Sequence, residues 1–363
     1  MGESKDEFSL LAQKASNTIR LNTLELSCRD KGWLNKKVIV DGFVRDRRLW
    51  TADLFVAIRS NVLLDESENG AGKNSLIFLA EKQLKSGYIP CSRALDGSLR
   101  PLSFCLDEYT IWWILCWWDY YCMTKDEGFL KDFYGVSLKA MRYLEGKMED
   151  GLFVQKGLRS LNWCWTLLRM GKVAYSNALL YKAMLSVAEA SGILGKASEE
   201  SEYLEKSSNL KARINDEMWD DAIGVYRDIG ISKDYVFLDN NVICSLFGVS
   251  DKNQSRNSLE FIRKNMWTDL GTLIVDRPYK WRFSDWHKDV ICPFMSYFEI
   301  EARMKMRQRK LADELITRTL GNSLARDENT VWEFWKSDGS ISKKVSRCHS
   351  WSTGVLSLLS HRN

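Results

Sequence analysis

The sequence predicts an all-α fold, and three observations indicate it. Apolar residues recur at helical spacing along nearly the whole chain, in segments joined by alternating short and long loops. Strand-like patterns are sparse and limited to 38–40, 152–154 and 224–226. No repeat of fixed period is present, which argues against a helical solenoid. The run of antiparallel helix pairs therefore predicts a closed double ring of hairpins, whose loops gather at one end into a single cleft.

Each predicted helix is defined by its apolar spacing and by the residues that begin or end it. The predicted helices are 54–64, 74–85, 107–123, 127–147, 172–191, 197–219, 240–247, 254–264, 293–306, 311–320 and 349–360. Asp107 stands where it would cap the aromatic helix that it opens. The turn Asp150-Gly151 follows 127–147, and Gly192 suits the left-handed conformation that often ends a helix. The polar pair Asp220-Asp221 stops 197–219.

The composition predicts one domain covering residues 1–363. The chain has 363 residues of which 45% are hydrophobic, so it can bury a large core. Only four prolines are present, and no linker rich in Ser, Gly or Pro divides the chain. The one flexible-looking stretch, 65–74, is too short to separate two domains.

The charge distribution argues against nucleic-acid and membrane partners. The 52 basic and 48 acidic residues are interspersed and leave a net charge of +4. The densest basic run, 303–310, spreads its charges around a helix and is expected to be a solvated face. The longest apolar run, 109–123, is interrupted by Asp119 and is short for a membrane span. The polar N-terminus has no secretory pattern, so a cytoplasmic location is expected.

The nine cysteines predict neither a metal site nor a disulfide framework. They are spread out, without a CxxC pair or a cluster with histidine. Cys105, Cys116, Cys164 and Cys244 lie in apolar helical runs, where reduced and buried thiols are expected.

Three carboxylates stand close together in the segment 41–53. Asp41, Asp46 and Asp53 follow one another around the Gly42 turn, with Arg45 among them. Neighbouring carboxylates raise one another's pKa and an arginine lowers it, so one acid could stay protonated while the others ionise. The alternative is a helix cap with local salt bridges, in which Asp41 and Asp46 pair with arginines 45, 47 and 48.

Two later segments carry further candidates for chemistry. Glu333 lies between two tryptophans and a phenylalanine, where burial would raise its basicity and suit it to activate water. The alternative is a surface glutamate in a loop whose aromatic residues pack inward. His349 is one of three histidines and follows Cys348. Its alternatives are a helix-capping or structural histidine, or a weak nucleophilic pair with Cys348.

The 15 tryptophans indicate a sugar site as well as a core. Core packing explains many of them, but Trp50, Trp163 and Trp332 have polar neighbours: Asp53 near the first, Asn162 before the second and Glu333 after the third. An aromatic face beside carboxylates and amides matches a sugar, because the ring stacks on the C–H face while polar groups bind the hydroxyls.

Several motifs then resemble one known family. The segment DGFVRDRRLWTAD at 41–53 resembles the signature loop of the α-L-rhamnosidases of the six-hairpin glycosidase superfamily. The similarity continues in the family's order through YTIWWILCWWDYY, LNWCW, SNALLYKAML, MWDDAIGVYRD, DNNVICSLFGV, PFMSYFEIEA, TVWEFW and SRCHSWSTG. Together these segments span nearly the whole chain.

The resemblance implies a fold, a reaction and a set of residues. The fold would be an (α/α)6 barrel, and the reaction would be hydrolysis of terminal α-L-rhamnosyl groups with inversion. Asp46 would be the general acid and Glu333 the general base. The sugar pocket would be lined by Asp41, Arg45, Trp50, Asp53, Trp163 and His349, to which we add Trp112, Asn162 and Trp332 from the matching segments. No cofactor and no metal are implied, and the partner would be a small glycoside or a related metabolite.

Three positions depart from the family pattern, and they leave other functions open. Asp46 stands where glutamate is usual, Ala52 replaces a glycine, and Asn162 replaces an acidic residue. The β-sandwich modules that usually flank the barrel are also missing, so we expect a stand-alone barrel. One alternative is a repurposed barrel that catalyses cyclisation or isomerisation of a hydrophobic metabolite, in a closed apolar pocket. Another is a sugar-binding protein without catalysis.

Overall fold

A computed structural model describes residues 3–28, 32–43, 45–64, 69–157, 161–164, 167–282, 289–324 and 328–360. Its α-helices are α1 (Glu3–Asn22), α2 (Thr51–Leu64), α3 (Asn69–Ala80), α4 (Asp107–Thr124), α5 (Glu127–Glu145), α6 (Ala174–Ile193), α7 (Ala197–Met218), α8 (Leu238–Phe247), α9 (Lys252–Asn265), α10 (Pro293–Lys305), α11 (Arg309–Leu324) and α12 (Val355–Ser360). Two 3-10 helices, η2 (Pro101–Phe104) and η5 (Ser350–Gly354), add to these.

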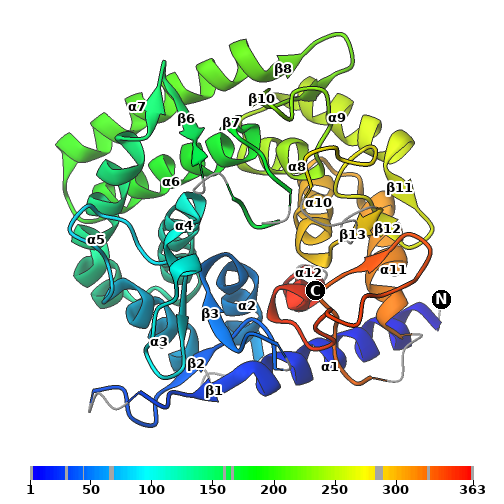
Figure 1. Cartoon of the computed structure of the whole chain (residues 1–363), viewed down its shortest axis with the longest axis horizontal. Coiled ribbons are helices and arrows are strands. Elements are labelled where there is room, and N and C mark those ends of the chain that lie inside the picture. The colour runs from blue at the N-terminus through cyan, green and yellow to red at the C-terminus, as the bar shows by residue number, and fades with distance from the viewer. Residues whose placement is uncertain are drawn as a thin grey trace.

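Alternate helices form an inner ring. Helices α2, α4, α6, α8 and α10 each contact the next, and η5 with α12 contacts both α10 and α2, so the ring closes. The helices α3, α5, α7, α9 and α11 lie outside it, each packed on the inner helix that it follows (Figure 1). The predicted all-α (α/α)6 barrel is therefore confirmed.

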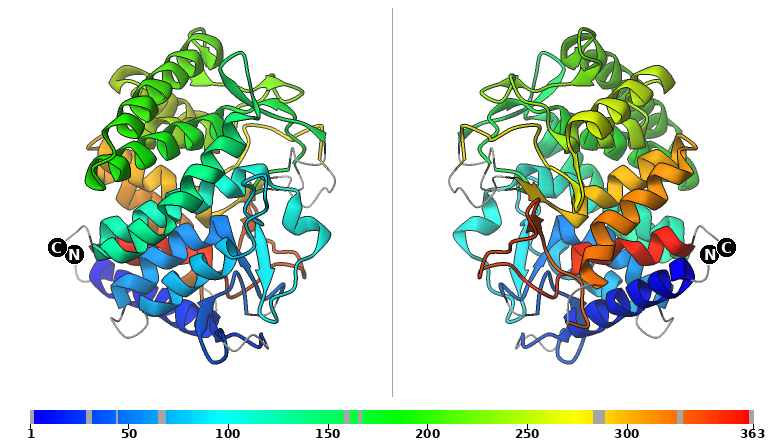
Figure 2. Two further views of the ribbon diagram at one scale, coloured as in Figure 1. Left: turned by 90° about the vertical axis from the view of Figure 1, so that its left-hand side faces the viewer. Right: turned by 90° about the vertical axis from the view of Figure 1, so that its right-hand side faces the viewer.

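The last hairpin is made from the two ends of the chain. Helix α1 packs against α12 and also against α11, which closes the outer ring. The strands and long loops project from one face of the ring, while α1 begins and α12 ends toward the other face (Figure 2). Contacts between the first and last helices thus hold the ring shut.

The composition of each helix matches its place in the ring. Inner helix α4 is apolar on all sides, and its Trp112, Trp113 and Trp117 are fully buried. A helix that is hydrophobic all round needs neighbours on every side, which only the inner ring provides. Outer helix α9 has one buried stripe and begins at a capping box formed by Asp251 and Gln254.

The strands are short and antiparallel. They are β1 (Thr23–Glu25), β2 (Lys37–Ile39), β3 (Arg48–Trp50), β4 (Ser92–Ala94), β5 (Met148–Glu149), β6 (Leu152–Gln155), β7 (Gly171–Lys172), β8 (Trp219–Asp220), β9 (Val225–Tyr226), β10 (Ile229–Gly230), β11 (Trp267–Thr268), β12 (Gly271–Thr272), β13 (Val290–Ile291) and β14 (Trp335–Lys336). They pair as β1-β2, β3-β4, β8-β9, β11-β12 and β13-β14, with one four-stranded sheet of order β10-β7-β6-β5. The predicted strands correspond to β2, β6 and β9.

Several local predictions are wrong because tertiary contacts decide them. Asp107 does not cap α4, whose N-cap is Leu106; its carboxylate accepts a hydrogen bond of 2.6 Å from Tyr143 Oη. Gly192 lies inside α6, which continues to Ile193. Arg303 is fully buried and paired with Glu299 at 2.7 Å, so the run 303–310 is not wholly a solvated face.

The burial of the cysteines agrees with most of the expectations for them. All nine cysteines are free, and Cys116, Cys164 and Cys244 are buried as predicted, whereas Cys105 is half-exposed. Within the described ranges, no group of His, Cys, Asp and Glu is arranged to hold a metal ion. No helix of the described part of the chain has both the length and the apolar composition needed to cross a bilayer.

Candidate active site

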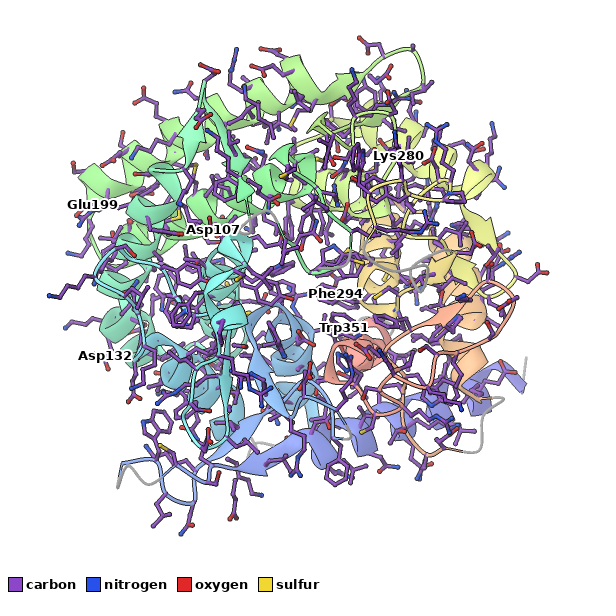
Figure 3. The ribbon with its side chains drawn as sticks, in the orientation of Figure 1. Asp107, Asp132, Glu199, Lys280, Phe294 and Trp351 are labelled. Carbon is purple, nitrogen blue, oxygen red and sulfur yellow. The ribbon has the colours of Figure 1, made fainter. Side chains whose placement is uncertain are left out.

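Buried carboxylates gather where the inner helices begin. Asp53, Glu108 and Asp239 each lie in the first turn of an inner helix, and they are 4%, 0% and 2% exposed. The free N–H groups at a helix N-terminus favour negative charge nearby. Beside them, Phe294 and Trp351 lie near the centre of the ring (Figure 3), stacked with ring centroids 5.2 Å apart.

The segment after β2 is fixed by backbone contacts. The buried Asp41 carboxylate accepts a hydrogen bond of 3.0 Å from the backbone N–H of Arg48, and the Ser350 N–H donates to the Asp41 carbonyl at 2.7 Å. Gly42 forms an isolated antiparallel bridge with His349. Burial raises the pKa of Asp41 well above its usual value, and the nearby Asp53 adds to this shift.

Asp46 lies exposed on a tight turn, and its neighbour Arg45 reaches across the site. Asp46 and Arg47 both adopt left-handed conformations, with φ of 62° and 48°. Arg45 forms an ion pair with Glu333, which is 288 positions away in the sequence. Two of the three arginines therefore differ from the local salt-bridge alternative, because Arg45 pairs with Glu333 and the Arg48 side chain donates to Ser92 and Ser103.

Glu333 is held from three directions. Its side chain is buried, with 4% of the residue exposed, so the surface-glutamate alternative is wrong. Oε1 accepts from Arg45, and Oε2 accepts a hydrogen bond of 2.9 Å from the Ser346 N–H. Trp351 Nε1 donates to the Glu333 carbonyl at 3.2 Å. The guanidinium and the amide compensate the charge of a carboxylate that has little access to solvent.

His349 faces Asp53 rather than Cys348. Its Nε2 lies 3.0 Å from Asp53 Oδ1, and both side chains are buried. Burial raises the pKa of Asp53 to about 8 and lowers that of His349 to about 4. The Cys348 Sγ instead contacts Asn22 Oδ1, and burial raises its pKa to about 11. The Cys348–His349 nucleophilic pair is therefore wrong. His349 occupies the N-cap position of η5, but its side chain makes no capping hydrogen bond.

Trp163 is clamped at both ends. Its backbone N–H donates to Glu108 Oε1 at 2.6 Å, and its indole Nε1 donates to Asp239 Oδ2 at 2.8 Å. Asp239 in turn accepts from buried Arg169 at 2.7 Å. Asn162 is fully buried, and its Oδ1 accepts from the Cys164 N–H. These bonds fix the indole plane of Trp163 against Phe294 and Trp351.

The other three predicted sugar-binding tryptophans differ in access. Trp50 is half-buried and packs edge-on against Tyr109. Trp332 is 4% exposed and lies in a small cluster with Ile291 and Trp335. Trp112 is fully buried in α4 and donates its indole N–H to Tyr175 Oη at 2.9 Å. Trp112 therefore supports the site from within the core, and its face is covered by other aromatic rings.

This architecture is similar to that of known proteins, by sequence and by structure. The sequence model of the amylo-alpha-1,6-glucosidase family matches residues 22–357. The chain belongs to this family. The closed ring of hairpins agrees with this membership.

Solved structures with the same fold match nearly the whole chain. A rhamnosidase from Klebsiella oxytoca with rhamnose bound has a TM-score of 0.78 at 16% identity, over 99% of this chain and 64% of that chain. The GH78 family rhamnosidase of Bacillus sp. GL1 has a TM-score of 0.76 at 19% identity, over 98% of this chain and 35% of that chain. The GH63 mannosylglycerate hydrolase from Thermus thermophilus in complex with glucose has a TM-score of 0.70 at 12% identity, over 96% of this chain and 99% of that chain. The chain thus spans under two thirds of both rhamnosidases.

Sequence reasoning missed three buried residues of this candidate site. Glu108, Arg169 and Asp239 form the support of Trp163, with Asp228 and Asn240 as further partners of Arg169. The sequence did contain a signal for two of them. Glu108 lies in the first turn of a predicted helix and Asp239 directly precedes another, and a helix N-terminus favours a negative charge. Arg169 lies in an irregular loop, and its burial has no local signature.

Replacement of Gly42 by alanine tests whether activity depends on the position of the His349 side chain. A Cβ at Gly42 would lie 2.7 Å from Ser346 Oγ and 3.2 Å from both the Cys348 carbonyl and His349 Nδ1. Displacement of these groups should lower kcat/KM for glycoside hydrolysis on the order of 10²-fold. Gly135→Ala is the matched control, because Gly135 is exposed on α5 and a Cβ there meets nothing within 4 Å. Equal activity of the two variants would show that the His349 seat tolerates displacement.

Proposed function

We propose that this glycosidase removes terminal α-L-rhamnosyl groups with inversion, with Asp46 as general acid and Glu333 as general base. The observation that carries the proposal is the Arg45–Glu333 ion pair. It joins the turn that holds Asp46 to the segment that holds Glu333. Both carboxylates also act on one imidazole: burial lowers the pKa of His349 to about 4, while Glu333 and Asp46 act in the opposite direction. In this proposal residues 1–363 form one domain, which carries both carboxylates.

Glu333 has the surroundings that a general base needs. Each carboxylate oxygen offers two lone pairs, so its bonds to Arg45 and Ser346 leave an acceptor position for a water. In the proposed step Glu333 takes a proton from this water, whose oxygen bonds to the anomeric carbon as the bond to the leaving group breaks. The buried position keeps other water molecules away from the reacting carbon.

Asp46 has the position that a general acid for a variable leaving group needs. Its side chain is exposed, so an aglycone of any size could depart toward solvent from it. Asp46 would give its proton to the glycosidic oxygen as the bond breaks. In inverting enzymes the two carboxyl groups lie roughly 6.5–9.5 Å apart, which leaves room for the water.

The remaining predicted residues would hold the sugar. Trp163 offers a fixed aromatic face beside Trp351, whose ring also contacts His349. Asp41 and His349 would bind hydroxyls in the buried region around Asp53. Arg45 would share its guanidinium between Glu333 and the ligand, and Trp50, Trp332 and Asn162 would complete the surroundings. Trp112 is left out of the proposed contacts, because its ring is covered on all sides.

The sugar itself is supported by two kinds of similarity. The rhamnosidase-like motifs and the two rhamnosidase structures favour a rhamnosyl group. The description of the matching family as amylo-alpha-1,6-glucosidase favours a second candidate, a glucosyl group. The axial and equatorial hydroxyls of these sugars differ, so one set of carboxylates cannot serve both equally.

The proposal is tested by following single products by ¹H NMR. Aryl α-L-rhamnoside and aryl α-D-glucoside are supplied separately, and the anomeric proton of the first product is observed before mutarotation. We expect β-L-rhamnose first from the rhamnoside and far slower turnover of the glucoside. Faster cleavage of the glucoside would select the second candidate. Rhamnose binding by calorimetry without turnover of either compound would select a binding protein.

The variant Asp46→Asn tests whether Asp46 is the general acid. Its kcat should fall by about 10²- to 10⁴-fold on a rhamnoside with a poor leaving group. It should fall far less with a 2,4-dinitrophenyl leaving group, which departs without protonation. Asp132→Asn is the matched control, since this carboxylate lies on α5 at the outer edge of the ring (Figure 3). Equal losses on both substrates would remove Asp46 from the acid role.

A further inference from the structure

We propose that Asp53 is a positioning residue that sets the tautomer of His349, so that the imidazole presents an Nδ1–H donor to the ligand. Loss of the Asp53 proton would turn the same nitrogen into an acceptor. The inference rests on the proposed function only where the ligand is taken to be a sugar.

The geometry holds the imidazole in one orientation. Nε2 of His349 is bonded to Asp53 Oδ1 at 3.0 Å, with the two residues 2% and 4% exposed. The backbone N–H of His349 donates to the Val331 carbonyl at 3.0 Å, and Gly42 pairs with His349 on the other side. The ring of Trp351 packs edge-on with its centroid 4.6 Å away. A ring flip would break the bond to Asp53, so each nitrogen keeps its own surroundings.

The second nitrogen of His349 points to a ligand. Among the described residues, His349 Nδ1 is buried and has no hydrogen-bond partner. A buried polar atom without a partner costs free energy, so such atoms usually mark a site where something binds. The lack of a side chain at Gly42 leaves Nδ1 uncrowded on that side, since a Cβ at position 42 would approach it to 3.2 Å.

The protonation state of Asp53 decides which ring nitrogen of His349 carries the hydrogen. Burial raises the pKa of Asp53 to about 8 and lowers that of His349 to about 4. Between these values Asp53 is protonated and donates to Nε2, so the neutral imidazole carries its own hydrogen on Nδ1. Above about pH 8 the carboxylate has lost its proton. Nε2–H then donates to the ionised Asp53, and Nδ1 becomes an acceptor.

Charged and titratable groups on several elements face this pair. Those acting on His349 are Glu333, Arg45 and Asp46, and those coupled to Asp53 are Arg45, Asp46, Asp41, Tyr109 and Cys116. Arg45 opposes protonation of both partners, whereas Asp46 favours it. Burial is the largest influence on the pKa of both residues.

The Nδ1–H donor complements what the rest of the site provides. Asp41 and Glu333 supply acceptors when they are ionised. A sugar hydroxyl both donates and accepts, so it can give its hydrogen to a carboxylate while its oxygen accepts from His349. The site would therefore select a hydroxyl at this position and reject the corresponding deoxy sugar.

The tautomer is measured directly by ¹⁵N NMR of histidine-labelled protein without ligand. The chain has three histidines, so the wild-type spectrum is simple, and His287→Asn and His361→Asn assign His349 by elimination. We expect the Nδ1–H tautomer at pH 6–7 and a change to the Nε2–H tautomer as the pH passes about 8. An imidazolium at pH 7, or the Nε2–H tautomer already at pH 7, would overturn the proposal.

The variant Asp53→Asn removes the switch. Since asparagine does not ionise, the tautomer of His349 should no longer change between pH 6 and 9, and a change that persists would place the titrating group elsewhere. The wild-type spectrum keeps the test valid even where this variant folds poorly.

The ligand measurement adds a functional readout. In the wild type, KM for the rhamnoside should rise roughly tenfold as the pH passes 8, because a donor to the hydroxyl is lost. A KM that stays flat while the tautomer changes would refute the contact between His349 and the ligand. The NMR measurement uses no substrate, so it can succeed even where rhamnoside hydrolysis, and with it the proposed function, fails.

Discussion

Replacement of Glu333 by glutamine is expected to lower kcat for rhamnoside hydrolysis by about 10²- to 10⁴-fold. The amide keeps the size and most contacts of the side chain but cannot take a proton from water. KM should change much less, because Glu333 acts on the water rather than on the sugar. Steady-state kinetics with an aryl α-L-rhamnoside measure both constants.

Chemical rescue makes this prediction specific for the base. In Glu333→Ala, azide can enter the space beside the anomeric carbon and attack it without losing a proton. The C–N bond forms as the bond to the leaving group breaks, and Asp46 still protonates the departing oxygen. The expected product is β-L-rhamnosyl azide, identified by NMR and mass spectrometry.

The control for Glu333 is a carboxylate far from the site. Glu199 lies in the first turn of α7 at the outer edge of the ring (Figure 3), so Glu199→Gln should retain wild-type activity. Near-normal turnover by Glu333→Gln, or an azide product with the α configuration, would contradict the assignment of Glu333 as the base of an inverting reaction.

Replacement of Arg169 by methionine should lower the free energy of unfolding by about 3–5 kcal/mol. Arg169 is 1% exposed and bonds to Asp228 at 3.0 and 3.1 Å, to Asp239 at 2.7 Å and to Asn240 at 2.6 Å. Its loss leaves two buried carboxylates without their cation, which costs far more than the packing of methionine restores.

Urea unfolding followed by tryptophan fluorescence measures this effect. Arg263→Met is the matched control, because Arg263 pairs with Glu260 on the solvent side of α9 and its loss should leave the midpoint unchanged. Arg169→Lys should lose stability to an intermediate degree, since an ammonium keeps the charge but cannot form the planar contacts. Similar midpoints for Arg169→Met and Arg263→Met would show that the buried network does not stabilise the fold.

This network also links stability to the site. Asp239 holds the indole of Trp163, so Arg169 acts on the proposed sugar platform through Asp239. Burial alone would raise the pKa of Asp228, yet its bonds to Arg169 hold that pKa below the usual value. The ionised pair is therefore part of the framework rather than of the reaction.

The pattern of apolar residues was sufficient to predict most of the fold. Period and turn residues located most of the helices, and α4 could be placed in the inner ring because it is apolar all round. Helix boundaries were less accurate, since Leu106 rather than Asp107 caps α4 and α6 extends past Gly192. These ends depend on contacts with other elements, such as that of Asp107 with Tyr143.

The sequence by itself determined the order of the helices and the segments that carry the candidate acid, base and histidine. Those features depend on local spacing and on motifs, which a single chain displays directly. Only the tertiary structure decided that Arg45 pairs with Glu333, that Asp53 pairs with His349, and that Arg169 holds Asp239. Partners of this kind are up to 296 positions apart, and closure of the ring brings them together. Burial then sets their protonation, because the free energy of a charge depends on surroundings that no local pattern contains.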